Sequence, residues 1–205
     1  HKNFIINLGI SSKKIEIMQN YLKTDFINES TIEENSIIYA GRISKEKGVE
    51  ELVRSFISAN LLNTKLKIIG DGPLLEFLKD KYSEENIKYL GELPNEKVLE
   101  EIKKARAVIT CTKLFENQPT LLCEASSLGV PSIFPNRGGI NEFFPENYEL
   151  MFDPNNSQDL VNKLKLVDQS KKLKNIGKSN KDFIKKLLDE KKVINDFEKI
   201  LINES

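Results

Sequence analysis

Two acidic residues lie close together in an otherwise apolar segment near the middle of the chain. Glu116 and Glu124 are eight positions apart, with Pro119 between them. A carboxylate has two acceptor oxygens, so it can bind two neighbouring hydroxyl groups of a ribose or another sugar. The pair therefore suggests a ligand that contains a ribose and a second sugar. The simpler alternative is that Glu116 caps a loop and Glu124 complements a helix dipole.

A helix that begins between these acids would add a site for an anion. Pro119 is predicted at the first helical position, where its missing N–H costs nothing. The N–H groups that follow have no partner inside the helix and carry partial positive charge. Glu116 would then lie in the loop before the helix, and Glu124 near its second turn. The amides expected to face the anion are those of Thr120, Leu121 and Leu122.

A second candidate anion site is the stretch AGRISKEKG, at residues 40–48. Gly41 ends an apolar run and lets the chain turn. Arg42 and Lys47 then flank the predicted start of a helix, with Ser44 as its N-cap. An arginine binds phosphate through its planar fork and a lysine binds it as a point charge, so this pair could hold a diphosphate. The alternative is two surface cations beside a cap. The spacing does not match a Walker phosphate loop.

Two further glycine turns follow apolar runs. IIGDGP, at residues 68–73, lacks the full G-x-G-x-x-G pattern, so it is a poor match to a nicotinamide dinucleotide fingerprint. In FPNRGGINE, at residues 134–142, Gly138 and Gly139 open a short helix and Arg137 adds a positive charge. This is another loop suited to an anion, although a plain glycine turn explains the same residues.

Short apolar runs alternate with segments of helical periodicity through most of the chain. Strands are expected within residues 36–41, 65–73, 86–94, 106–112, 130–136 and 148–153, and helices within residues 45–62, 74–82, 95–105, 119–129 and 138–144. Because the strands are apolar throughout rather than alternating, both faces of their sheet should be covered. The pattern predicts an α/β fold, a Rossmann-like three-layer arrangement with a parallel sheet whose ligand lies at the carboxyl ends of the strands.

The two ends of the chain fit this scheme less closely. NFIINLGI and KIEIM, both in the first thirty residues, could be edge strands or part of a linker. From Ser157 the pattern is helical to the end, with breaks expected near residues 175–177. We therefore expect a linker or first strands at residues 1–35, a core at 36–170 and C-terminal helices at 171–205.

The overall charge of the chain gives no indication of a strongly charged binding partner. Lys and Arg total 31, as do Asp and Glu, so nothing global indicates nucleic acid or an anionic membrane. The segment at residues 163–192 is rich in lysine, which suggests a solvated helix face or a contact with acidic lipid headgroups. Cys111 and Cys123 lie in apolar surroundings without metal-ligand spacing, so reduced buried thiols in a cytosolic protein are expected.

Other features limit location and chemistry. No run of about 18 apolar residues predicts a membrane span, and no signal peptide is recognised. The chain starts at His1 without a methionine, so we expect a piece of a longer protein. His1 is the only histidine, which makes catalysis by a histidine base within this chain unexpected.

The order and placement of these motifs together resemble a known family. The chain is similar to the C-terminal, nucleotide-binding half of the retaining glycosyltransferases of the GT-B fold, in the group 1 (family 4) class. The resemblance is carried by IIYAGRISKEKG, LKIIGDGP, IKYLGELPNEKV and the E-x7-E motif ENQPTLLCE with ASSLGVPSIFPNRGGINE after it. It covers residues 36–153 and continues more loosely through the C-terminal helices. Before residue 36, MQNYLKTDF resembles the strand-to-linker PNG segment only at Asn20, with Tyr21 in place of the glycine.

The resemblance implies a role for each matching residue. Arg42 and Lys47 would bind the donor diphosphate and stabilise the leaving nucleoside diphosphate. Glu124 would bind the ribose, and Glu116 would contact the hydroxyls of the donor sugar. Other donor contacts implied are the base-contacting Leu93, the amides of Thr120, Leu121 and Leu122, and the loop of Gly138 and Gly139.

One departure concerns the sugar. The family often has glycine directly after the first glutamate or one residue later, whereas this chain has Asn117 and Gln118. Both side chains can hydrogen-bond a sugar. This difference leaves the identity of the donor sugar open.

The implied activity is transfer of a sugar from a nucleoside diphosphate sugar, with UDP as the expected nucleotide, and with retention of anomeric configuration. No metal and no other cofactor would be required. The acceptor, a glycan or a lipid-linked glycan of a bacterial polysaccharide pathway, would bind an N-terminal domain that is absent from this chain. The full-length protein would be cytoplasmic with a peripheral contact at the inner face of the membrane, and this chain alone would bind donor without turnover. The alternatives are a nucleotide-sugar epimerase of the same architecture and a non-catalytic nucleotide-binding module.

Overall fold

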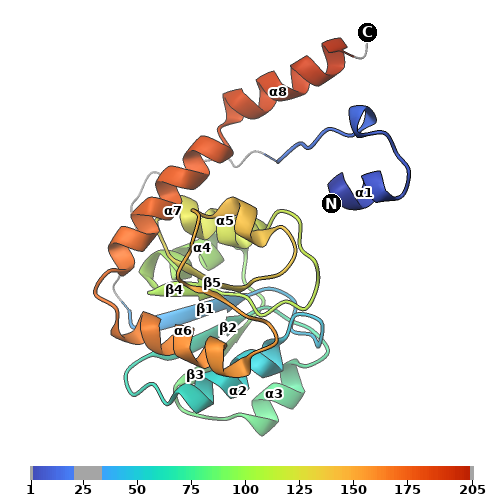
Figure 1. The fold of residues 1–205 in the computed structure, drawn as a ribbon. Helices are drawn as coiled ribbons and strands as arrows, with labels where there is room; N and C mark the ends of the chain where they lie inside the picture. Colours follow the sequence, from blue (N-terminus) through green and yellow to red (C-terminus); the bar gives the residue numbers. More distant parts are fainter. Residues whose placement is uncertain (1, 21–33, 204–205) are drawn as a thin grey trace.

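Six parallel strands form one sheet at the centre of the chain (Figure 1). The structure is a computed structural model that describes residues 2–20 and 34–203. The strands are β1 (Ser36–Ala40), β2 (Lys65–Ile69), β3 (Ile87–Gly91), β4 (Ala107–Ile109), β5 (Ser132–Pro135) and β6 (Met151–Phe152). Each of the six predicted apolar runs contains one of them, so the predicted α/β fold with a parallel sheet is confirmed.

The order of the strands predicts a crevice at one edge of the sheet. That order is β3-β2-β1-β4-β5-β6, so the chain winds outward from β1 in one direction and from β4 in the other. Ligands of such sheets bind where the direction reverses, outside the carboxyl ends of the two central strands. The loop after β1, which carries the predicted cation pair, therefore lies beside the loop after β4, which carries Glu116.

Helices cover both faces of the sheet (Figure 1). Buried residues of α2 (Val49–Ala59), α3 (Leu75–Lys81) and α6 (Ser157–Gln169) belong to one hydrophobic core. Buried residues of α4 (Asn95–Lys104) and α5 (Thr120–Ser127) belong to a second core on the opposite face, together with Ile184 of α7 (Leu173–Leu187), whose first residue Leu173 packs into the first core. A short 3₁₀ helix, Ile140–Phe143, also packs into the second core.

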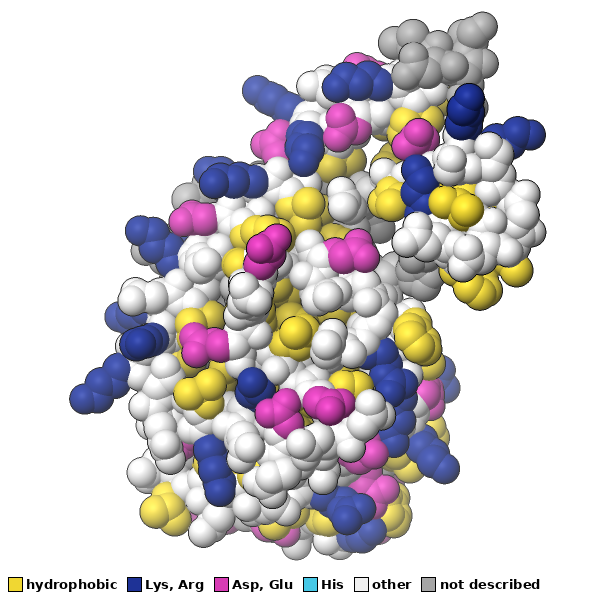
Figure 2. Space-filling view, viewed as in Figure 1, with side chains coloured by type: hydrophobic (Ala, Val, Ile, Leu, Met, Phe, Trp, Pro, Cys, Tyr) yellow, Lys and Arg dark blue, Asp and Glu magenta, His cyan; other side chains and the backbone are white. Residues whose placement is uncertain are grey.

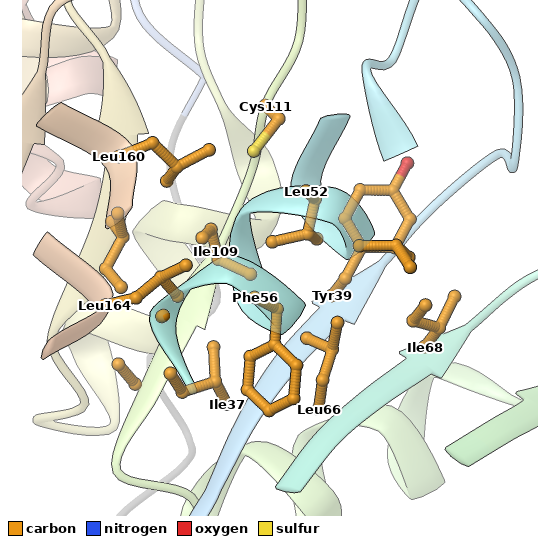
Figure 3. Packing of buried hydrophobic residues seen from close by; sticks show 14 of the residues in the cluster. Ile37, Tyr39, Leu52, Phe56, Leu66, Ile68, Ile109, Cys111, Leu160 and Leu164 are labelled. Atoms are coloured by element: carbon orange, nitrogen blue, oxygen red, sulfur yellow. The ribbon is translucent and has the colours of Figure 1, made fainter. Parts of the chain in front are cut away.

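Alternate residues of each strand point to opposite cores. Ile37 and Tyr39 of β1 pack into the first core, whereas Ile38 between them packs into the second. Figure 3 shows Ile37 and Tyr39 among Leu66 and Ile68 of β2 and side chains of α2 and α6. Full burial of an apolar side chain of this size stabilises a fold by about 1.5–3 kcal/mol. The two-sided burial explains why the strands are apolar throughout.

Helix α7 contradicts the predicted break near residues 175–177. The helix runs without interruption from Leu173 to Leu187, and Gly177 lies within it. A Cβ atom on Gly177 would lie 1.8 Å from the carbonyl oxygen of Gly129, two residues after the end of α5. The glycine therefore permits a close approach of two helices, and it does not end one.

Residues 2–20, the described part of the N-terminal segment, form no strand. The start of NFIINLGI lies in α1 (Lys2–Asn7), and KIEIM has no regular structure after Lys14, which ends a single 3₁₀ turn, Ser12–Lys14. The edge strands considered for this segment are therefore not present. Tyr21 and the acidic residues at 29–33 lie outside the described residues. Figure 1 shows α1 and α8 (Glu190–Asn203) lying beyond the three layers, on the same side of the molecule.

The lysine-rich segment and the cysteines take ordinary positions. Most lysines of residues 163–192 are exposed, and Figure 2 shows Lys and Arg side chains spaced along the flank that holds α7.

Cys111 and Cys123 are free and buried, as expected. Burial raises the pKa of Cys123 to about 12 and raises that of Cys111 further still, so neither thiol is reactive near neutral pH. None of the helices described has the length and apolar character needed to cross a bilayer.

Candidate functional site

The loop after β1 carries Arg42 and Lys47 on a turn. The phenol of Tyr39 donates a hydrogen bond to the carbonyl of Arg42 at 2.8 Å. No hydrogen bond or ion pair joins the Arg42 guanidinium to any other residue that the structure describes. Its five N–H donors can therefore meet a ligand.

The predicted N-cap at Ser44 is wrong. Residues 44–48 form a turn, and α2 begins only at Val49, after Gly48 in a left-handed conformation with φ of 67°. A Cβ atom on Gly48 would lie 2.1 Å from the carbonyl oxygen of Cys111, at the end of β4. The backbone of this turn packs directly on the loop after β4, and that contact delays the start of the helix.

The loop after β2 packs just as closely on the loop after β1. A Cβ atom on Gly70 would lie 2.0 Å from the carbonyl oxygen of Gly41. The amide of Ile43 donates to the carbonyl of Asp71 at 2.8 Å. The glycines of IIGDGP therefore serve contacts between backbones, and the three loops hold one another in place.

Glu116 and Lys47 form an ion pair that joins the loop after β1 to the loop after β4. Lys47 Nζ donates to Glu116 Oε1 at 2.6 Å, and Thr112 Oγ1 donates to the same oxygen at 3.0 Å. Burial acts to raise the pKa of Glu116, but the bonds from Lys47 and Thr112 outweigh it and hold that pKa below its ordinary value. Glu116 is thus ionised at neutral pH. Its Oε2 accepts no hydrogen bond from the described residues, so it remains available to a ligand.

Gly138 and Gly139 lie against the backbone of Glu116. The amide of Gly139 donates to the carbonyl of Glu116 at 3.0 Å. A Cβ atom on Gly138 would lie 2.8 Å from that carbonyl oxygen, so only glycine allows this approach. Arg137 instead donates to the carbonyl of Lys113 and stacks over the ring of Phe115. The loop after β5 therefore supports the loop that carries Glu116.

Glu124 lies where α5 meets the start of α4. Asn95 Nδ2 donates to Glu124 Oε1 at 3.5 Å. Burial raises the pKa of Glu124, and the bond from Asn95 offsets only part of this rise. Leu93, two residues before Asn95, lines a pocket of about 470 Å³ together with Arg42 and residues 69–72. A line of neighbouring groups thus runs from the loop after β1, past Leu93, to Glu124.

The first turn of α5 contributes backbone N–H groups to the candidate site. Pro119 precedes the helix, which begins at Thr120, one residue later than predicted. The first helical hydrogen bond runs from the amide of Cys123 to the carbonyl of Pro119. The three amides before it therefore have no partner within the helix. Thr120 is exposed, whereas the Leu122 side chain is only 1% exposed in the second core, so Leu122 can offer a ligand nothing but its amide.

Two features escaped the sequence reasoning. The Gln118 amide, considered as a sugar ligand, is hydrogen-bonded instead to the backbone of Asn20. A larger pocket of about 590 Å³ lies between α2, α6 and the ends of β4 and β5, with Arg54, Lys113 and Arg137 in its wall. Its lining comes from segments spread over residues 51–161, and no local motif marks it. Among the residues described, no three His, Cys, Asp or Glu side chains converge as metal ligands would.

Replacement of Glu124 by glutamine is expected to raise the melting temperature at pH 7. Because burial raises the pKa of Glu124, the folded chain holds its charged form at a cost that the unfolded chain does not have. The sign follows from linkage: Glu124 contributes most below its unfolded value of 4.5, and that contribution is lost as the pH rises through its folded value. The gain from glutamine should therefore disappear near pH 4.

Thermal unfolding of both proteins between pH 4 and pH 8 measures this effect. The exposed Glu146 provides the control, since Glu146→Gln should leave the melting temperature nearly unchanged throughout. A Glu124→Gln protein that melts below the parent at pH 7 would show that the carboxylate is stabilised in the fold and would contradict the prediction.

A sequence model of the family described as "Glycosyl transferases group 1" matches residues 22–186 of the chain. The teichuronic acid biosynthesis glycosyltransferase TuaC of Bacillus subtilis, whose function is itself described as putative, is 28% identical over 63% of this chain and 32% of its own length. An Escherichia coli UDP-Gal:α-D-GlcNAc-diphosphoundecaprenol α-1,3-galactosyltransferase is 26% identical over 85% of this chain and 50% of its own length. The chain thus spans about a third to a half of these relatives.

Solved structures share the fold. The lipopolysaccharide outer core galactosyltransferase WaaB matches all of this chain and 60% of its own with a TM-score of 0.80 and 21% identity. Anabaena HepE, solved in complex with UDP, matches 98% of this chain and 61% of its own with a TM-score of 0.84 and 15% identity. At these identities the likeness concerns the fold alone.

Proposed function

The chain belongs to the group 1 glycosyl transferases, and on that premise we propose that it is the part of such an enzyme that binds the activated sugar donor. The donor is a nucleoside diphosphate sugar, with UDP as its nucleotide. The observation that carries the proposal is the Lys47–Glu116 ion pair between the loops after β1 and β4. A cation and an acid held together there can bind a phosphate and an adjoining sugar at the same time.

The diphosphate would lie between the loop after β1 and the first turn of α5. Lys47 uses one of its three donors on Glu116, and Arg42 uses none on the residues described, so both can bind phosphate oxygens. The partnerless amides of α5 add partial positive charge. The base would occupy the pocket beside Leu93, and Glu124 would accept hydrogen bonds from the ribose hydroxyls.

The same groups suit the bond-breaking step. When the bond between the anomeric carbon and the phosphate oxygen breaks, negative charge grows on the diphosphate while the sugar becomes cation-like. Fixed cations stabilise that charge without reorganising as it develops. Glu116, ionised and with one free oxygen, is placed to hold the sugar hydroxyls. We propose that no divalent metal is required. We also propose that the acceptor attacks the sugar from the same face from which the leaving group departs, so that the anomeric configuration is retained.

The acceptor site belongs to another part of the enzyme in this proposal. Because the chain spans about a third to a half of its curated relatives, a domain of comparable size would complete the crevice. The acceptor is a glycan or a lipid-linked glycan. The 205-residue chain should therefore bind the donor nucleotide but show no transfer on its own.

Titration calorimetry of the chain with UDP, GDP and ADP tests the proposal. Measurable binding to UDP is expected, with weaker or no binding to the other two because the pocket beside Leu93 has to fit the base. Preference for GDP or ADP would revise the nucleotide while keeping the donor role. If none of the three binds at millimolar concentration, the proposed function is wrong.

A further inference from the structure

The side chain of Gln118 forms two hydrogen bonds with the backbone of one distant residue. Gln118 Oε1 accepts from the amide of Asn20 at 2.8 Å, and Gln118 Nε2 donates to the carbonyl of Asn20 at 2.8 Å. A primary amide presents one acceptor and one donor in a plane, as a neighbouring strand would. The two residues are 98 positions apart in the sequence. This reciprocal pair is hereafter called the Gln118–Asn20 clamp.

The clamp joins two otherwise separate parts of the chain. Among the described residues, its two bonds are the only hydrogen bonds recorded between residues 2–20 and residues 34–203. Residues 2–20 lie largely outside the layers of the fold (Figure 1). Within the described residues, one side chain thus makes every hydrogen bond that links this segment to the rest of the fold.

That side chain belongs to the loop that carries Glu116. Gln118 is two residues after Glu116 and directly before Pro119, whose ring restricts the backbone of the residue that precedes it. Lys47 and Thr112 hold the side chain of Glu116, and Gly139 holds its carbonyl. Among the described residues, the clamp is this loop's only hydrogen-bonded link to residues 2–20. A shift of Asn20 must therefore act on the loop through Gln118.

We propose that Gln118 is a positioning residue that couples the segment ending at Asn20 to the donor-holding loop. This inference rests on the proposed function, because the coupling concerns the donor nucleotide. When the donor nucleotide binds at Lys47, Glu116 and the start of α5, the loop that carries Glu116 becomes more ordered. Because of the clamp, Asn20 becomes more ordered as well. By linkage, fixing Asn20 strengthens nucleotide binding to the same degree. The position of the segment before residue 21 would then report on whether a donor is bound.

Nuclear magnetic resonance of the ¹⁵N-labelled 205-residue chain tests the clamp directly. Gln118→Met keeps the length of the side chain but removes both hydrogen bonds, so the Asn20 amide signal should shift and its hydrogen exchange should accelerate. Gln118→Glu keeps the acceptor but places an acid against the Asn20 carbonyl, so a smaller shift is expected. Gln169→Met, at an exposed glutamine in α6, is the matched control and should leave Asn20 unchanged. An Asn20 signal that is the same in the parent and in Gln118→Met would overturn the inference.

Addition of UDP tests the coupling. In the parent chain UDP should shift the Asn20 amide, and in Gln118→Met it should not, while the affinity for UDP falls about threefold, as expected for modest, partly exposed hydrogen bonds. If UDP binds the parent but Asn20 does not respond, the coupling is wrong and the proposed function stands. If UDP does not bind at all, the proposed function fails and the coupling fails with it, whereas the exchange data still report on the clamp.

Discussion

Replacement of Arg42 and Lys47 together by alanine is expected to abolish binding of UDP to this chain. Both side chains follow β1 at the crevice, and between them they supply the full positive charges that would face the two phosphates. A hydrogen bond to a charged group contributes about 1.5–3 kcal/mol, which corresponds to about tenfold to hundredfold in affinity for each cation. Titration calorimetry of the double variant measures the loss.

The single variants should differ in a way that the ion pair explains. Lys47→Ala removes a phosphate ligand and also leaves the Glu116 carboxylate without its cation, so this acid would then repel the diphosphate. Arg42→Ala removes a ligand only. We therefore expect Lys47→Ala to weaken binding more than Arg42→Ala does.

A matched control distinguishes the two pockets of the molecule. Arg54→Ala with Lys113→Ala removes the same charge from the wall of the larger pocket of about 590 Å³. This pair should leave the affinity for UDP nearly unchanged. If the control pair abolishes binding and the Arg42, Lys47 pair does not, the nucleotide lies in the larger pocket and the assignment of the crevice is wrong.

The substitution Gly177→Ala is expected to destabilise the fold severely, although alanine is the better helix former. In an exposed helix, alanine would be favoured over glycine by about 1 kcal/mol. At Gly177, however, the new Cβ atom would lie 1.8 Å from the carbonyl oxygen of Gly129, which belongs to the backbone and cannot rotate away. Helices α5 and α7 would have to separate, at a net cost of about 2 kcal/mol or more.

Thermal or urea-induced unfolding measures this cost. In a domain of this size, a loss of 2 kcal/mol lowers the melting temperature by roughly 4–8 °C. Asn175→Ala, at an exposed position of the same helix, should instead leave stability unchanged or slightly higher. Equal melting temperatures for Gly177→Ala and the parent would show that the two helices do not approach as closely as described.

Local patterns in the sequence were enough to predict the layers of the fold. All six strands lie within predicted apolar runs, because a strand buried on both faces must be apolar throughout, as Ile37 and Ile38 illustrate. The parallel sheet then placed the loops of Lys47 and Glu116 at one edge. Their direct ion pair could not be predicted, since it depends on how far two side chains reach across the crevice.

The errors arose where a distant backbone decides the local structure. Ser44 and Gly177 both read as helix boundaries, one as an N-cap and the other as a break. In the fold, Gly48 packs on Cys111 and delays the helix beyond Ser44, and Gly177 packs on Gly129 inside a continuous helix. The contact between Gln118 and Asn20 is likewise invisible in the sequence, because no pattern links positions so far apart.

The close packing of the three loops at the crevice limits how this protein can diversify. With Gly48 against Cys111 and Gly70 against Gly41, an inserted residue in any of these turns would displace the other two. Enzymes built on α/β sheets commonly evolve new specificity by changing the length of such loops, and that route is closed here. Libraries that aim to alter the proposed donor should therefore keep every turn at its present length and randomise side chains, with Leu93 varied for the base and Asn117 for the sugar.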